Sequence, residues 1–341
     1  MDYPLNEEML DNLLADPGSD LIEMMKRLPG DIMILGINGK MGLTMGRLAV
    51  NAIRTAGCSK QVIGVSRFSD PEGRRKLEEW GIRTIACDLL DRNAVVELPQ
   101  VPNVIFMAGR KFGTDGAEDL TWAMNVLAPA YVGEHFKESR IVAFSTGCVY
   151  PLTSAETGGC TEAVTPEPVG DYSQSCLGRE RIFSYCSRTY GTRVLLFRLN
   201  YAIDLRYGVL HDIAEQVWNN RPVNNTVGHF NVIWQGDANR YALRALEYAG
   251  SPAVPLNITG PETIPVEYIA EKFGELMERP VSYTGTPGDK CYLNNAAKAF
   301  SLFGYPRMSL EKMIEMQAEW FKNGGRSLGK PTHFEVNNGK F

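Results

Sequence analysis

The stretch Asp31-Ile32-Met33-Ile34-Leu35-Gly36-Ile37-Asn38-Gly39-Lys40-Met41-Gly42 decides the fold. In it, a short apolar run leads into a glycine-rich turn of spacing G-x-x-G-x-x-G, and a helical pattern over residues 43–56 follows directly. Glycine at these points permits a tight turn, and the start of the following helix offers amide donors and a positive dipole end to a pyrophosphate. A ligand-free glycine turn is the alternative. This order of strand, loop and helix nevertheless predicts a dinucleotide-binding turn made by Gly36, Asn38, Gly39, Lys40, Met41 and Gly42.

Short apolar runs alternate with longer helical patterns between residues 31 and 200. Runs that are rich in β-branched residues and apolar on both faces are typical of parallel strands covered by helices. We therefore predict an α/β protein with a Rossmann-type, doubly wound parallel sheet over residues 31–200, to which the chain returns around residues 228–258. The predicted strands span residues 32–35, 61–65, 83–86, 104–107, 141–144 and 194–197.

The two ends of the chain show different patterns from this central part. Residues 1–30 predict an N-terminal helical extension of two short helices, interrupted at Asp16-Pro17-Gly18. Residues 201–341 predict a smaller C-terminal α/β domain that binds the substrate, followed by a polar tail from residue 324. The helices expected there cover residues 266–278, 294–303 and 310–323.

The composition favours a small-molecule partner. A chain of 341 residues with 44% hydrophobic residues is long enough to bury a large core. Its net charge of −5, without basic blocks, argues against binding to nucleic acid or a membrane surface. We find no signal-peptide pattern, no apolar run of membrane-spanning length, and no cysteine or histidine spacing typical of a metal site. We therefore expect a cytoplasmic protein with reduced cysteines and no metal.

The second predicted strand ends at Val65-Ser66-Arg67, where an NAD-preferring site would offer an acid to the ribose hydroxyls. No acid is present at this point. The guanidinium of Arg67 presents a donor fork suited to the 2′-phosphate of NADP, although an ordinary surface arginine is the alternative. The prediction is NADP, with NAD as the alternative.

Further motifs occur in order along the chain. They are Cys87-Asp88-Leu89-Leu90-Asp91, Phe106-Met107-Ala108-Gly109-Arg110-Lys111, Asn125-Val126, Phe144-Ser145-Thr146-Gly147-Cys148-Val149-Tyr150, the segment 168–180 with Tyr172, and Asn257-Ile258-Thr259-Gly260. On these motifs the chain resembles, over residues 31–323, the NAD-dependent epimerase/dehydratase family, the extended branch of the short-chain dehydrogenases.

The resemblance implies roles for particular residues. Tyr172 is expected to be the proton donor or acceptor, and Thr146 the hydroxyl that holds the same substrate oxygen. The resemblance also implies a sugar-like substrate and a homodimer formed through helices that include the catalytic one. Beyond the glycine turn, the expected cofactor contacts are Ser66, Arg67, Asp88, Leu89, Ala108, Gly109, Lys111, Asn125 and Tyr172.

One member of the family's catalytic set is missing. The family places a lysine four residues after the tyrosine, because a phenol with a pKa of about 10 is a poor base at neutral pH. The motif here is Tyr172-Ser173-Gln174-Ser175-Cys176, so a cysteine stands at that position. Three explanations compete: another cation, Lys111 or Arg110, supplies the field; Tyr172 is a structural hydroxyl in a protein that only binds cofactor; or Cys176 is a reactive thiol.

The substrate side also departs from the family pattern. Nucleotide-sugar members carry an arginine seven residues before Asp237, and Phe230 stands there in this chain. We therefore expect a secondary alcohol or ketone of a sugar or sugar-like molecule, not a nucleotide sugar, with oxidoreductase or epimerase chemistry. A catalytically silent cofactor sensor or scaffold of the same fold is the rival hypothesis. The expected substrate contacts are Arg110, Asn200, Tyr201, Phe230 and Trp234, although the last two also suit a hydrophobic core.

Overall fold

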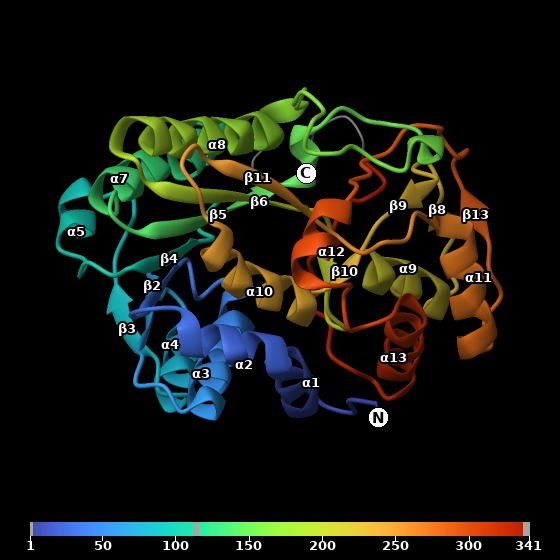
Figure 1. Ribbon diagram of the computed structural model, residues 1–341. Helices are drawn as coiled ribbons and strands as arrows, with labels where there is room; N and C mark the ends of the chain where they lie inside the picture. Colours follow the sequence, from blue (N-terminus) through green and yellow to red (C-terminus); the bar gives the residue numbers. More distant parts are fainter. Residues whose placement is uncertain (1–2, 112–115, 337–341) are drawn as a thin grey trace.

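A seven-stranded parallel sheet forms the centre of the larger domain (Figure 1). The computed structural model describes residues 3–111 and 116–336. The strand order is β3-β2-β1-β4-β5-β6-β11, so the direction of winding reverses between β1 and β4, and the predicted doubly wound Rossmann-type sheet is confirmed. The strands are β1 (Ile32–Leu35), β2 (Val62–Ser66), β3 (Arg83–Ala86), β4 (Asn103–Phe106), β5 (Arg140–Thr146), β6 (Arg193–Leu199) and β11 (Val254–Ile258).

Helices cover both faces of this sheet (Figure 1). Alternate residues of β1 enter the two opposite cores, because side chains of a strand point to its two faces in turn. Ile32 and Ile34 pack toward one layer of helices, whereas Met33 and Leu35 pack toward the other. The first layer contains α2 (Gly18–Arg27), α3 (Gly42–Ala56), α4 (Pro71–Glu79), α10 (Gln235–Arg244) and α12 (Ala297–Phe303). The second contains α5 (Arg92–Val96), α7 (Ala128–His135) and α8 (Gly170–Tyr190).

Several short elements connect these layers. A π-helical segment, η1 (Ala123–Leu127), joins α6 (Glu118–Trp122) to α7 in one continuous run. Such π-helical segments are rare in proteins, and those that occur often lie at functional sites. Three 3₁₀ turns complete the set: η2 (Gly147–Val149) after β5, η3 (Ala155–Thr157), and η4 (Ala245–Tyr248) after α10.

The smaller domain has its own apolar core, surrounded by α9 (Val209–Trp218), α11 (Val266–Met277) and α13 (Leu310–Lys322) (Figure 1). Two-residue strands pair beside these helices: β7 (Ala202–Ile203) with β10 (Ile233–Trp234), β9 (His229–Phe230) with β12 (Ile264–Pro265), and β8 (Val223–Asn224) with β13 (Tyr283–Thr284). These pairs tie together segments that are far apart along the chain.

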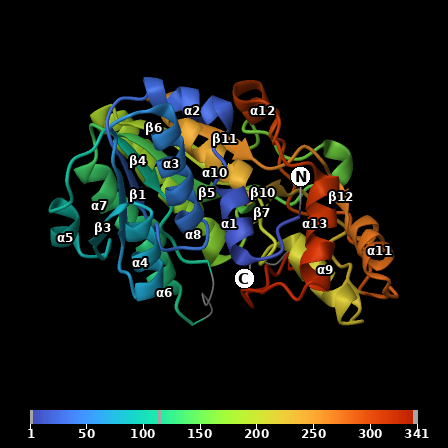
Figure 2. The same ribbon diagram turned by 90° about the horizontal axis from the view of Figure 1, so that it is seen from below.

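The N-terminal extension contacts both domains (Figure 2). Leu10 and Leu14 of α1 (Glu7–Leu14) are fully buried in the core of the smaller domain. Leu21 and Met24 of α2 are fully buried in the core between α3 and the sheet. The two helices therefore lie across the junction of the domains.

The chain beyond α13 packs against α9 and the segment before it. The amide of Leu328 donates to the carbonyl of Arg206 at 3.0 Å. Both the amide and the hydroxyl of Thr332 donate to Oδ2 of Asp212, at 2.7 and 2.5 Å. Phe334 is buried with its ring 6.1 Å from that of Phe230. Through these contacts residues 328–334 pack onto the smaller domain. Within the described residues, no helix is long and apolar enough to span a bilayer.

Candidate functional site

The glycine turn between β1 and α3 has the shape that a pyrophosphate needs. Gly36 has a φ of 93°, and a Cβ there would lie 2.7 Å from the amide nitrogen of Ala108, so only glycine fits. A Cβ at Gly39 would lie 3.2 Å from the carbonyl oxygen of Gly36, a tight contact with the backbone of the turn itself. Among the described residues, the amides of Asn38, Lys40 and Met41 donate to no carbonyl or side chain. These donors and the start of α3 fit a bound dinucleotide.

The predicted adenosine side lies at the same edge of the sheet. Ser66 ends β2, and the exposed Arg67 follows it; no ion pair within the described residues involves Arg67. Asp88 follows β3, and its Oδ1 accepts the amide of Leu90 at 3.0 Å, while Leu89 is buried. Ala108, after β4, packs directly against Gly36. The carboxyl ends of neighbouring parallel strands bring these residues together, as a dinucleotide site requires.

A cavity of about 210 Å³ opens where the ends of β4, β5 and β6 face the smaller domain. The side chains that line it in the described part of the chain include four basic groups, Lys40, Arg110, Lys111 and Arg179, and no carboxylate. Such a lining favours an anionic ligand. The uncharged residues that matter for chemistry are Met41, Gly109, Thr146, Cys148, Tyr172, Asn200, Tyr201 and Thr332.

Tyr172 and Thr146 meet in this cavity. Tyr172 lies in the first turn of α8, and Thr146 is the last residue of β5. The hydroxyl oxygen of Thr146 also accepts a hydrogen bond from the amide of Cys148 at 3.2 Å. Burial raises the pKa of the Tyr172 phenol well above its ordinary value, and the neighbouring thiols of Cys176 and Cys148 raise it further. Arg179 and a hydrogen bond from Thr146 act in the opposite direction. The pair can therefore hold one substrate oxygen and exchange a proton with it.

Cys176 lies one turn beyond Tyr172 and is 1% exposed. Burial raises the pKa of its thiol to about 11, so the thiol is neutral at pH 7. A reactive cysteine needs a depressed pKa and some exposure. The geometry therefore favours a buried filler at this position over a nucleophile, and Cys176 does not replace the charge of the expected lysine.

The two cations named from the sequence both reach the cavity. Lys111 Nζ lies 6.0 Å from the centroid of the Tyr172 ring, and burial lowers the pKa of this ammonium group. Arg110 lines the cavity, and its backbone is clamped by Asn125, whose Oδ1 accepts the Arg110 amide at 3.0 Å while Nδ2 donates to its carbonyl at 3.1 Å. Asn125 itself is fully buried and does not line the cavity.

A third cation, Arg179, is not singled out by any sequence motif. It is 5% exposed, and it donates from Nη1 to the carbonyl of Phe144 at 2.7 Å and from Nη2 to Oδ1 of Asn125 at 2.6 Å. It stands seven residues after Tyr172, two turns along α8, and residues at this spacing share a helix face. That spacing is the signal from which the sequence could have indicated it.

The expected substrate residues separate into two groups. Asn200 and Tyr201 follow β6 and line the cavity. Phe230 and Trp234 do not: they are 1% and 3% exposed and belong to the apolar core of the smaller domain. Their neighbours are apolar side chains of that core, so the alternative role considered for these aromatic residues, core packing, is the one that their surroundings fit.

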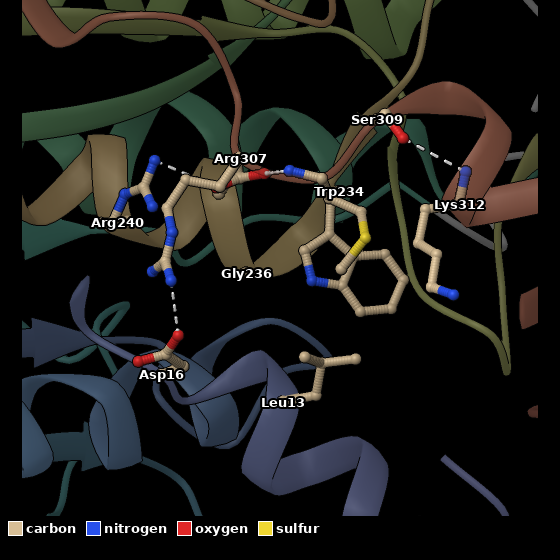
Figure 3. Close-up of a pocket in the computed structure, with 10 residues that line it drawn as sticks. Leu13, Asp16, Trp234, Gly236, Arg240, Arg307, Ser309 and Lys312 are labelled. Carbon is tan, nitrogen blue, oxygen red and sulfur yellow. Dashed lines mark hydrogen bonds and ion pairs between the residues drawn. The ribbon is translucent and has the colours of Figure 1, made fainter. Parts of the chain in front are cut away.

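Trp234 borders a different cavity, of about 350 Å³, which lies between α1 and the beginnings of α10 and α13 (Figure 3). It shares no lining residue with the cavity at Tyr172. Figure 3 shows Arg307 pointing toward Asp16, with which it pairs at 2.8 Å. Arg240 pairs with Asp237 at 3.1 Å. The positive charges of Arg307 and Arg240 are thus balanced by Asp16 and Asp237, which line the same cavity. We therefore interpret this cavity as a gap in the packing where the N-terminal extension meets the rest of the chain. In the described residues, no cluster of three or more His, Cys, Asp or Glu side chains could hold a metal ion.

Comparison with known proteins identifies the architecture. The chain matches no protein-family model and no curated protein sequence. Among solved structures, UDP-glucose 4-epimerase from Thermotoga maritima with UDP-glucose is 18% identical, with a TM-score of 0.68 over 86% of this chain and 99% of that one. UDP-glucuronic acid 4-epimerase from Bacillus cereus with NAD is 17% identical, with a TM-score of 0.70 over 86% and 98%. The chain has the fold of these epimerases.

A third structure, UDP-glucose 4-epimerase from Thermus thermophilus with NAD, is 18% identical, with a TM-score of 0.68 over 86% of this chain and 99% of that one. At identities this low, the likeness confirms the expected resemblance for the fold alone. About a seventh of this chain lies outside each match, whereas almost nothing of the epimerases does. The shared fold is therefore complete, and this chain adds segments to it.

Proposed function

We propose that the chain is an NAD(P)-dependent oxidoreductase or epimerase that acts on a secondary alcohol or ketone of a sugar or sugar-like molecule. The observation that carries this proposal is the hydrogen-bonded pair of Tyr172 and Thr146, which shares one cavity with Lys40 and Met41 of the glycine turn. A phosphate-binding turn and an acid–base pair in one cavity are what hydride transfer at a hydroxyl-bearing carbon requires.

The residues of this chain would divide the work as follows. The open amides of the turn hold the pyrophosphate, and Asp88, Leu89, Ala108 and Gly109 border the rest of the cofactor at the sheet edge. A bound nicotinamide would accept or donate the hydride. Thr146 donates a hydrogen bond to the substrate oxygen, and Tyr172 takes or returns its proton. Asn200 and Tyr201 face the substrate from the smaller domain.

For the cofactor we propose NADP, with NAD as the alternative. Arg67 is exposed at the end of β2 and engaged in no ion pair of the described residues, so its donor fork is available for a 2′-phosphate. The Bacillus cereus and Thermus thermophilus structures contain NAD. Parallel calorimetric titrations with the two dinucleotides decide the preference.

For the substrate, two features point in different directions. Phe230 is buried in the position where the sequence resemblance leads us to expect a diphosphate-binding arginine, which favours a sugar without a nucleotide. The Thermotoga maritima structure contains UDP-glucose, and the cationic cavity of this chain suits an anion. We propose a sugar or sugar-like substrate and assay free sugars, sugar phosphates and UDP-sugars side by side.

The test combines binding with turnover. Wild-type protein should bind a nicotinamide dinucleotide, and Gly39→Val should abolish binding, because the added side chain crowds the backbone of the turn that would face the pyrophosphate; circular dichroism checks that the variant is folded. Tyr172→Phe should lower turnover by about 10²- to 10⁴-fold, as for loss of a general acid or base. Tyr190→Phe is the matched control, since this tyrosine is exposed at the far end of α8. Absence of affinity for either dinucleotide would overturn the proposal; binding with no turnover of any substrate would favour the sensor or scaffold.

A further inference from the structure

The face of α8 that carries Tyr172 also carries a positive charge, at position 179 instead of the expected position 176. Tyr172, Cys176 and Arg179 are spaced i, i+4 and i+7, so they form one stripe on the helix. Position 176 and position 179 are direct neighbours on that stripe, because residues three apart meet on a helix surface. A cation that starts at 179 can therefore serve the region that a cation at 176 would serve.

The guanidinium of Arg179 is held by neutral groups. Among the described residues its acceptors are the carbonyl oxygen of Phe144 and the amide oxygen of Asn125, and its buried Nε has no hydrogen-bond partner there. No carboxylate within the described residues pairs with it. An arginine stays protonated at any accessible pH, so this guanidinium keeps its positive charge, and no paired carboxylate cancels that charge. A field of this kind extends into the cavity that Arg179 lines.

The loop after β4 leaves room for this side chain. A Cβ at Gly109 would lie on Nη2 of Arg179, so the absence of a side chain there makes room for the guanidinium in its present position. Asn125 fixes the same nitrogen from the π-helical segment and, through Nδ2, also bonds Ser175 Oγ of α8 at 2.9 Å. Three separate elements therefore position one cation beside the cavity.

We propose that Arg179 is the positioning residue that takes over the electrostatic task of the lysine missing at position 176, and stabilises the phenolate form of Tyr172. This inference rests on the proposed function, because it assigns a source for the charge that the chemistry of Tyr172 needs.

The charged and titratable groups around the phenol agree with this assignment. Cys176 on α8 and Cys148 after β5 both raise the Tyr172 pKa, and burial raises it most. Arg179 lowers it and is the strongest cationic influence on it. Lys111, after β4, lies 6.0 Å from the ring centroid, and burial lowers its own pKa. A permanent guanidinium is the more dependable charge of the two.

The experiment measures the phenol itself, without cofactor. 2,3,5,6-Tetrafluorotyrosine is placed at position 172, where four fluorines make the phenol acidic enough to titrate in the folded protein, and ¹⁹F NMR follows its titration. Arg179→Met should raise the midpoint by about one pH unit or more, because an opposite charge is removed. Arg179→Lys should stay close to wild type, and the double variant Cys176→Lys/Arg179→Met should recover most of the shift. A residue with only a packing role would give neither recovery.

A second variant guards against misfolding of Arg179→Met. Asn125→Asp keeps Arg179 and the side-chain volume but sets a carboxylate against its Nη2, which should also raise the midpoint. Circular dichroism checks the fold of each protein. An unchanged midpoint in a folded Arg179→Met or Asn125→Asp protein overturns the inference, whatever the enzyme does. Failure of the wild type to bind a dinucleotide would instead remove the proposed function and leave this titration result standing.

Discussion

Two buried arginines meet α8 at adjacent positions and differ in their partners: Arg179 belongs to the helix, and Arg198 of β6 pairs with the next helix residue, Glu180. Arg198 of β6 forms a two-pronged pair with Glu180, from Nε to Oε1 at 2.9 Å and from Nη2 to Oε2 at 2.6 Å. Its Nη1 donates to the hydroxyl of Tyr150 at 2.6 Å. Arg179, one position before Glu180, donates only to neutral oxygens. One charge is matched by an opposite charge, and the other is not.

The contrast separates a structural cation from one that acts on its surroundings. Burial alone would lower the pKa of the Arg198 guanidinium, but the hydrogen bonds and charge of Glu180 raise it above the usual value. The pair is therefore locked, and its field is largely cancelled by its own partner. The charge of Arg179 has no such screen and faces a cavity. Burial and hydrogen bonding look alike at the two sites, so the charge of the acceptor is the informative feature.

The largest effect on stability should come from Glu180→Gln. It leaves the Arg198 charge buried without a counter-charge, and breaking a buried pair in this way costs about 3–5 kcal/mol. Chemical denaturation measures the loss. Arg179→Met is the matched comparison and should cost less, about 1–3 kcal/mol, because it removes donors from neutral acceptors only. Equal losses in the two variants would contradict the distinction between the arginines.

A smaller effect is expected from Tyr150→Phe. The Tyr150 hydroxyl accepts from Arg198 and donates to Oδ1 of Asn257 at 2.9 Å, whereas both bonds between Arg198 and Glu180 stay in place. Loss of these hydrogen bonds should cost about 1–2 kcal/mol. Thermal unfolding would show it as a lowered Tm. A cost as large as that of Glu180→Gln would mean that the hydroxyl, and not the carboxylate, holds the guanidinium.

The smallest effect is expected from Glu72→Gln on α4. Glu72 pairs with Arg75 at 2.6 Å, but both side chains are more than half exposed. Water and salt screen such a pair, so Tm should stay within experimental error, and raising the salt concentration should leave the wild type and the variant alike. A drop in Tm comparable to that of Tyr150→Phe would show that acceptor charge matters even at the surface.

The sheet was well predicted from sequence because its signal is local. All six strands predicted by their apolar runs are present, with ends that differ by at most two residues. β11 was expected only as a return of the chain around residues 228–258. It contains Pro255, which removes a backbone donor, and the strand lies at the edge of the sheet where such a loss is tolerated. The short strand pairs of the smaller domain escape prediction, because their partners are distant in sequence.

Helix ends and cavity walls depend on contacts that sequence patterns do not reveal. The helix expected over residues 294–303 starts later, at Ala297, because Asn295 caps its amide and residues 291 and 294 form bridges with the 153–160 region. At the site, Tyr172, Thr146, Lys111 and Asn200 do meet in one cavity. From the sequence, Phe230 and Trp234 could either stack against a substrate or belong to a hydrophobic core. Only their packing in the structure distinguishes the two roles.

The N-terminal extension has a mechanical consequence. Through α1 it is anchored in one hydrophobic core and through α2 in the other, and ion pairs reinforce both anchors: Asp11 with Arg206 at 3.0 Å and Asp20 with Arg244 at 2.6 Å. The extension thus ties the two cores together, and a rotation of one core against the other would have to break these contacts. We therefore expect ligands to enter and leave the cavity through shifts of the loops that line it, while the two cores keep their mutual orientation.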